Sequence, residues 1–106
     1  MPLPPLSDIE IQRELNTLDG WSRRGEAIVK TFEFATFSLA IAWVTRVAES
    51  AEAANHHPDL DIRYTRVLAT LSTHDSGGVT ARDFVLAREM DALARTPDGE
   101  EPVKRA

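Results

Sequence analysis

The sequence predicts a single α+β domain in which helices pack on one face of an antiparallel sheet. Apolar residues recur at helical spacing in three segments, and they alternate along the extended segments between them. The resulting order of helix, hairpin, helix, strand, turn and helix is typical of α+β folds. With 106 residues, the chain can bury one core without added cross-links. We expect this core over about residues 7–95, with flexible ends at residues 1–6 and 96–106.

A capping box predicts the first helix. Ser7 caps the helix, Glu10 reaches back to the free N–H groups, and Asp19-Gly20 ends it. The apolar stripe of this helix has the expected spacing: Ile11, Leu15 and Leu18.

A hairpin is predicted next. It has an extended segment at Trp21-Ser22, a turn at residues 23–26 and a strand over residues 27–34. The side chains of the strand alternate, with Ile28, Phe32 and Phe34 on one face and Val29 and Thr31 on the other.

A longer helix follows, and either Thr36 or Ser38 can cap it. It ends near residues 55–57, because Pro58 cannot continue a helix. Its core stripe is predicted at Phe37, Ile41, Val44, Ala48 and Ala51. A second apolar stripe lies beside the first: Leu39, Trp43 and Val47. A helix that is apolar over this width has more to bury than one sheet can cover, so we expect a homo-oligomer, either a dimer or a tetramer.

Residues 61–73 are predicted as one long strand, and His74 ends it before a turn at residues 75–78. One side of the strand carries Val67, Ala69 and Leu71, and the other carries Tyr64, Leu68, Thr70 and Ser72. A second capping box, Thr80-Ala81-Arg82-Asp83, begins the last helix. The apolar stripe of this helix is Leu86, Met90 and Leu93.

The composition excludes several classes of function. The net charge is −5 and no Lys/Arg cluster forms a basic face, so a nucleic-acid partner is not expected. The start of the chain lacks the basic and apolar regions of a signal peptide, and no apolar run reaches the ~20 residues of a membrane span. The chain has no cysteine, which excludes disulfides and thiolate chemistry. We therefore expect a cytoplasmic protein that does not enter a membrane.

The three histidines all fall within residues 56–74: His56, His57 and His74. Histidine suits proton transfer at cellular pH, because its ordinary pKa lies near neutrality. The first two follow the long helix directly, and the third ends the last strand. A chain that places all its histidines in one stretch suggests a functional site there.

The residues alone leave other interpretations open. Exposed imidazoles can simply complement the negative end of a helix dipole, and Tyr64 and Trp21 are more often packing residues. Asp83 is the N3 carboxylate of the second capping box, which satisfies backbone donors, although it can serve a site as well. Glu52 lies four residues before His56 on the same helix face, where it can orient that imidazole or remain a solvated charge.

A zinc site is a further alternative, since three histidines and a water form a known catalytic zinc arrangement. Adjacent His56 and His57 would then have to reach one ion from an irregular backbone, so we favour a site without metal. No nucleophile elbow or phosphate loop is present either. The residues therefore indicate acid–base chemistry without a metal or a nucleophile.

The spacing of the whole stretch is more specific than the histidines alone. Its elements are Glu52-x3-His56-His57-Pro58, Tyr64, His74 and Asp83. The neighbouring motifs are Leu18-Asp-Gly-Trp21, Ala54-Asn-His-His-Pro-Asp59, Leu71-Ser-Thr-His74-Asp75 and Gly77-Gly-Val-Thr80-x-x-Asp83. This pattern resembles the signature of the pterin-4a-carbinolamine dehydratases and covers about residues 7–95. The resemblance implies a four-stranded antiparallel sheet with helices on one face, in the order α-β-β-α-β-β-α.

The resemblance also implies an activity, the dehydration of 4a-hydroxytetrahydrobiopterin to quinonoid dihydropterin without a cofactor. By position, it implies that His56, His57 and His74 line the pterin pocket. His56 and His74 would carry out acid–base work, and His57 would contact and polarise the substrate. The substrate would also contact Pro58, Asp59, Thr73, Asp75 and Ser76, and the supporting residues would be Glu52, Tyr64, Asp83 and Trp21.

The resemblance implies partners too. It suggests a homo-oligomer and a place beside an aromatic amino-acid hydroxylase in tetrahydrobiopterin recycling. The alternative is a non-catalytic role on the same fold, as a protein-binding dimerisation cofactor or an assembly factor. The presence of all three histidines favours the enzyme, because a scaffold does not need them.

Overall fold

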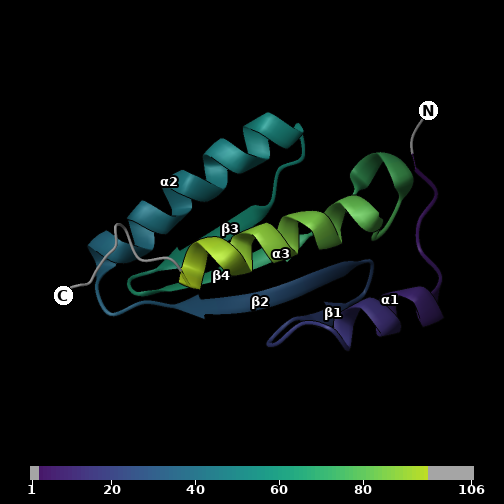
Figure 1. Cartoon of the computed structure of the whole chain (residues 1–106), viewed down its shortest axis with the longest axis horizontal. Helices are drawn as coiled ribbons and strands as arrows, with labels where there is room; N and C mark the ends of the chain where they lie inside the picture. The colour runs from purple at the N-terminus through teal and green to yellow at the C-terminus, as the bar shows by residue number, and fades with distance from the viewer. Residues whose placement is uncertain (1–2, 96–106) are drawn as a thin grey trace.

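The computed structural model describes residues 3–95. The elements are α1 (Asp8–Leu15), β1 (Ser22–Arg24), β2 (Ala27–Glu33), α2 (Phe37–Ala54), β3 (Asp59–Arg63), β4 (Arg66–Leu71), a 3-10 turn η1 (His74–Ser76) and α3 (Ala81–Arg95). The predicted α+β class and the α-β-β-α-β-β-α order are therefore confirmed (Figure 1). The part of the tail predicted over residues 96–106 lies outside the described residues.

The sheet is antiparallel throughout, with strand order β1-β2-β4-β3, and α2 and α3 lie on one face of it (Figure 1). Alternation decides which side chains meet the helices, because successive residues of a strand point to opposite faces. The buried core positions of β2 and β4 are Ile28, Phe32, Val67, Ala69 and Leu71. The alternation predicted for these two strands is thus confirmed.

The single long strand predicted over residues 61–73 is wrong. The chain reverses at Tyr64-Thr65, and β3 pairs with β4 from Asp59 opposite Thr70 to Arg63 opposite Arg66. Tyr64 has a φ of 58°, in the left-handed region that usually calls for Gly or Asn. The turn therefore carries none of the residues that mark a hairpin in a sequence.

The first hairpin turns later than predicted. Arg23 and Arg24 belong to β1, and the turn is Gly25-Glu26. Gly25 has a φ of 60°, which glycine adopts without a steric penalty.

The two stripes predicted for α2 are also wrong, because the buried stripe combines residues of both with Ala40, which was in neither. The side chains that pack into the core are Ala40, Trp43, Val47 and Ala51. Phe37, Leu39 and Ala48 are exposed. The Trp43 ring lies 4.4 Å from the Phe32 ring, centroid to centroid, and its indole N–H donates to Met90 O at 3.1 Å. Trp43 and Val47 therefore cannot form the intersubunit surface from which an oligomer was predicted.

The helix ends follow the predicted caps. Ser7 and Glu10 form the capping box of α1, and Thr36 caps α2. The segment before α1 contacts the loop that follows η1, where the Leu6 N–H donates to Val79 O at 2.8 Å. No helix within residues 3–95 has both the length and the apolar character needed to cross a bilayer.

Candidate functional site

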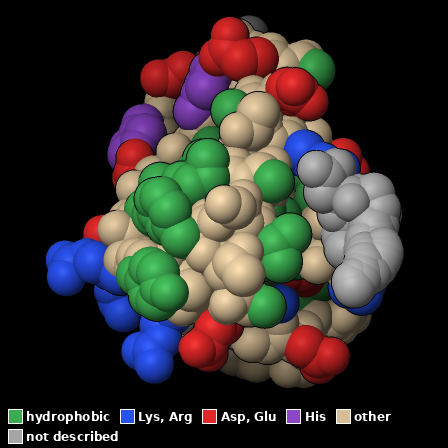
Figure 2. Space-filling model, turned by 90° about the vertical axis from the view of Figure 1, so that its left-hand side faces the viewer, with side chains coloured by type: hydrophobic (Ala, Val, Ile, Leu, Met, Phe, Trp, Pro, Cys, Tyr) green, Lys and Arg blue, Asp and Glu red, His purple; other side chains and the backbone are tan. Residues whose placement is uncertain are grey.

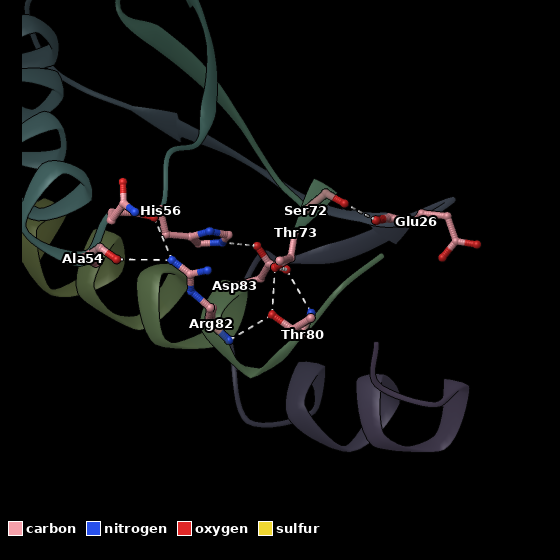
Figure 3. Close-up of polar contacts among 9 residues, drawn as sticks. Glu26, Ala54, His56, Ser72, Thr73, Thr80, Arg82 and Asp83 are labelled. Atoms are coloured by element: carbon pink, nitrogen blue, oxygen red, sulfur yellow. Dashed lines mark hydrogen bonds and ion pairs between the residues drawn. The ribbon is translucent and has the colours of Figure 1, made fainter. Parts of the chain in front are cut away.

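The three histidines line one hollow of about 190 Å³. It lies where the end of α2, the segment after β4 and the first turn of α3 come together (Figure 3). Its walls are Asn55, His56, His57, Ser72, Thr73, His74, Asp75 and Arg82. Segments that are distant in the sequence therefore bring all three imidazoles to the same place.

The end of α2 decides how the two adjacent histidines point. Asn55 adopts a left-handed conformation with φ 52°, and the His56 N–H donates back to Ala51 O at 3.0 Å. After this sharp exit His56 is buried, with 8% of its surface exposed, whereas His57 is exposed. One imidazole thus belongs to the floor of the hollow and the other to its rim.

The buried imidazole contacts a fully buried carboxylate. Nε2 of His56 lies 2.6 Å from Oδ1 of Asp83, which has 0% exposure. The other carboxylate oxygen, Oδ2, accepts the Thr80 N–H at 2.9 Å and the Thr73 hydroxyl at 2.8 Å. An ionised carboxylate can only accept, so the hydrogen of this contact is assigned to the imidazole. His56 therefore carries a hydrogen on Nε2, and in the neutral ring Nδ1 keeps the lone pair.

Two hydroxyls extend this network. The single Thr73 hydroxyl hydrogen is used on Asp83, so Thr80 donates to Thr73 Oγ1, at 2.7 Å. Thr80 Oγ1 in turn accepts the Arg82 N–H at 3.2 Å. Thr73 and Thr80 are both buried, so every donor needs a partner, and the chain of bonds has a single direction toward Asp83.

Of the two roles left open for Glu52, orienting His56 or remaining a solvated charge, the structure does not show the first. Its Oε2 lies 2.5 Å from Nε2 of His57, and both side chains are exposed. The i, i+4 geometry of a helix no longer applies beyond Asn55, whose left-handed conformation turns His56 inward and places His57 beside Glu52. The carboxylate that meets His56 is Asp83 instead, which keeps its predicted capping role at the same time.

His74 enters the hollow from the other side and is exposed. It begins η1, and the loop is closed by the Thr73 N–H, which donates to Gly78 O at 2.9 Å. Gly77 follows with a φ of 76°. The Ser76 hydroxyl donates to Leu3 O, which connects this loop to the segment before α1.

Not all of the predicted residues lie at the hollow. Tyr64 stacks on Phe37 at the opposite end of α2, with ring centroids 6.4 Å apart. Trp21 is buried in the core, where its indole N–H donates to Asp91 at 3.1 Å. Pro58 and Asp59 follow His57 but do not form the walls of the hollow, and neither does Ser76.

The structure adds wall residues that sequence reasoning missed, namely Asn55, Ser72 and Arg82. Thr80 was likewise predicted only as a cap. A signal existed for the wall residue Arg82 and for Thr80, because both belong to the same capping box as Asp83. Within residues 3–95, no group of three or more His, Cys, Asp or Glu side chains is arranged to hold a metal ion, so the three-histidine zinc arrangement is not formed.

Comparisons with known proteins place the chain in a family. The family model of pterin 4 alpha carbinolamine dehydratase matches residues 4–93. A protein of Roseiflexus castenholzii, named "putative pterin-4-alpha-carbinolamine dehydratase", is 52% identical over 83% of this chain and 95% of its own. A protein of Nocardia farcinica with the same name is 53% identical over 85% of this chain and 95% of its own.

A solved structure is similar as well. The crystal structure of a protein described as a transcriptional coactivator/pterin dehydratase from Brucella melitensis superposes with a TM-score of 0.83. Its sequence is 40% identical, and the match covers 85% of this chain and 98% of that one. The family match spans nearly the whole described chain and includes every segment that forms the hollow. The chain belongs to the pterin-4-alpha-carbinolamine dehydratase family.

Proposed function

We propose that the protein is a hydro-lyase that converts 4a-hydroxytetrahydrobiopterin to quinonoid dihydropterin and water. Family membership supports the substrate class. The observation that carries the proposal is the arrangement of three imidazoles around one hollow, with one of them held by a buried carboxylate. A second, larger groove of about 520 Å³ between α2 and α3 is also lined by His56, but it is mainly apolar and has neither His57 nor His74, so it has no second imidazole for the other proton transfer.

The reaction needs two proton transfers. An acid protonates the 4a-oxygen, the C4a–O bond breaks, and the hydroxyl leaves as water. A base removes the N5 proton as the C4a–N5 double bond forms. Hydroxide is a poor leaving group, whereas water is a good one, so the acid is essential. Both transfers take place near neutral pH, where imidazoles can both donate and accept protons.

We assign the two transfers to His56 and His74, which lie on different segments around the hollow. Asp83 holds His56 in one tautomer and would stabilise its charged form, as a carboxylate does behind a catalytic histidine in other enzymes. His57, supported by Glu52, would contact and polarise the substrate. The wall residues Thr73 and Asp75 would hold the pterin ring, and Pro58, Asp59 and Ser76, which follow wall residues in the sequence, would contact it once it is bound.

The wider setting is also part of the proposal. The enzyme would act in tetrahydrobiopterin recycling in the cytoplasm, beside an aromatic amino-acid hydroxylase, and would need no cofactor. A homo-oligomer remains expected, now on a different surface. Four apolar side chains are exposed at the start of α2 and on the β3–β4 hairpin: Phe37, Leu39, Ile62 and Tyr64. Figure 2 views this end of the molecule and shows apolar side chains gathered beside Lys and Arg.

The test is the rate at which purified protein removes the ultraviolet absorbance of the carbinolamine, after subtraction of the buffer rate. We expect acceleration without added metal and no effect of a chelator. Loss of activity with chelator would overturn the metal-free acid–base mechanism. A folded sample that gives no acceleration would overturn the enzyme proposal and favour the protein-binding role.

A further inference from the structure

Arg82 joins the start of α3 to the end of α2. Its Nη2 donates to Ala54 O at 3.2 Å and to Asn55 O at 2.7 Å (Figure 3). The last carbonyls of a helix have no intrahelical partner, and a cation at this end also complements the helix dipole. Both bonds come from Nη2, whose two hydrogens can serve the two carbonyls at once.

These two carbonyls belong to the residues directly before His56. Asn55 is the left-handed residue that turns the chain inward, so the direction of its peptide group decides where the His56 ring enters the hollow. Arg82 holds this peptide group, while its neighbour Asp83 holds the ring nitrogen. Two consecutive residues of the first turn of α3 therefore hold His56: Arg82 binds the peptide group that precedes it, and Asp83 binds its ring.

We propose that Arg82 is a positioning residue that sets the orientation of His56 through the exit of α2. This inference rests on the proposed function for its kinetic consequence, but its structural consequence can be measured separately. Without the two hydrogen bonds, the bond from the His56 N–H to Ala51 O is left to hold this peptide group, and the 2.6 Å contact between His56 and Asp83 loses part of its alignment. A displacement of about 1 Å at a reacting group can cost roughly 10²-fold in rate.

The test compares Arg82→Met, which keeps an apolar stem without donors, with Arg82→Lys, which keeps a cation and donors but not the planar guanidinium geometry that places Nη2 between the two carbonyls. Arg88→Met is the matched control. Arg88 lies on the same helix and also joins α3 to the rest of the domain, with Nη2 donating to Glu14 Oε1 at 2.6 Å and to Thr17 Oγ1 at 3.0 Å. It does not line the hollow, so its loss removes a comparable link without touching His56.

Two readouts are needed for each variant. One is the enzyme-dependent kcat and KM for the carbinolamine, and the other is the ¹⁵N signal pattern of the His56 ring, which reports which nitrogen carries the hydrogen. Arg82→Met should lower kcat by about 10- to 100-fold with a much smaller change in KM, and its His56 signals should shift away from the single Nε2–H pattern. Arg82→Lys should fall between Arg82→Met and the wild type in both readouts. Arg88→Met should keep the wild-type kcat and ring signals even if its melting temperature falls.

A folded Arg82→Met protein with wild-type kcat and wild-type His56 signals would overturn the proposal. Equal losses of kcat in Arg82→Met and Arg88→Met would also overturn it, because the effect would then be one of general stability. If the wild type itself has no activity, the proposed function fails, and the ring signals alone decide whether Arg82 positions His56. If Arg82→Met does not fold, Arg82→Lys decides: unchanged kcat and ring signals contradict the proposal.

Discussion

Nε2 of His56 lies 2.6 Å from Oδ1 of Asp83, and this contact connects residues that are 27 positions apart. Asp83 has two tasks in this arrangement. Its Oδ2 completes the cap of α3 by accepting the Thr80 N–H, and its Oδ1 fixes the tautomer of His56. A residue that looks like an ordinary helix cap therefore also organises the site, because both acceptors of one carboxylate are used.

Replacing Asp83 with Asn should reverse the polarity of its contact with His56. The Thr80 N–H and the Thr73 hydroxyl both donate to Oδ2, so the amide oxygen of Asn would take that position. The amide NH₂ would then face Nε2 of His56 and force the hydrogen onto Nδ1. We expect the enzyme-dependent rate to fall by about 10²- to 10⁴-fold, the usual contribution of a positioned acid or base. Steady-state kinetics measure the rate, and ¹⁵N spectra of the ring measure the tautomer.

Asp91→Asn is the control for this variant. Asp91 is the other buried aspartate of α3, but it binds Trp21 and Lys30 in the core. Its replacement should cost stability and leave the His56 ring signals unchanged. If Asp83→Asn keeps its activity, or if both variants lose activity equally, the tautomer argument fails.

His74→Ala should separate activity from stability. His74 is exposed in the loop after β4, and surface changes of this kind usually alter the free energy of unfolding by about 0.5 kcal/mol or less. The melting temperature should therefore stay within a few degrees, while the enzyme-dependent rate falls by about 10²- to 10⁴-fold. Calorimetry and kinetics on the same sample check both parts. Near-wild-type activity in this variant would remove His74 from the acid–base pair.

Tyr64→Gly should leave the dehydration rate unchanged. Tyr64 belongs to the motif that suggested the family, yet it lies in the β3–β4 turn and stacks on Phe37, at the opposite end of α2 from His56. Gly relieves the positive φ of 58° but makes the unfolded chain more flexible, so we expect a net stability change of about 1 kcal/mol or less. Kinetics and thermal denaturation measure the two effects. A large loss of rate in a stable variant would show that Tyr64 supports a site, for example that of a neighbouring copy.

Much of this fold was predictable, because caps and alternation are local signals. The capping boxes at Ser7 and Thr80 and the alternation of β2 and β4 depend on residues close together in the sequence. The β3–β4 turn was not predictable, since Tyr64 takes a left-handed conformation that its residue type does not favour. The stripe of α2 was not predictable either, because packing of the Trp43 ring on Phe32 decides which of two apolar faces is buried.

The site, like the fold, was predictable only in part. The family resemblance implied that the three histidines would line one pocket, and they line one hollow. The pairing of Glu52 with His56, one of the alternatives left open, is not formed, because the left-handed Asn55 places Glu52 beside His57 and Asp83 beside His56. Contacts across such a helix exit depend on one backbone conformation, which helical spacing cannot describe.

The capping box of α1 should give a measurable pH dependence. The pKa of Glu10 is lowered from its ordinary value of 4.5, first because its carboxylate accepts the Ser7 N–H and then because of its bond with the Ser7 side chain. The stability from this carboxylate is therefore fully present above pH 4.5 and is lost as the pH falls through the lower folded value. The difference in melting temperature between wild type and Glu10→Gln should be present at neutral pH and shrink in acid. A difference that stays constant with pH would contradict this account.

The surface that forms an oligomer can be tested with two substitutions on α2. Trp43 is buried against Phe32 and donates to Met90 O, so Trp43→Glu should unfold the domain rather than separate its copies.

Phe37 is 48% exposed, at the end of α2 where the exposed apolar side chains gather. Phe37→Glu should therefore keep the fold and shift the mass in sedimentation from an oligomer toward the 11.8 kDa monomer. Circular dichroism checks the fold of each variant. A wild-type monomer at micromolar concentration would contradict the predicted oligomer, and an oligomer that Phe37→Glu leaves intact would mean that another surface, such as the free edge of β3, holds the copies together.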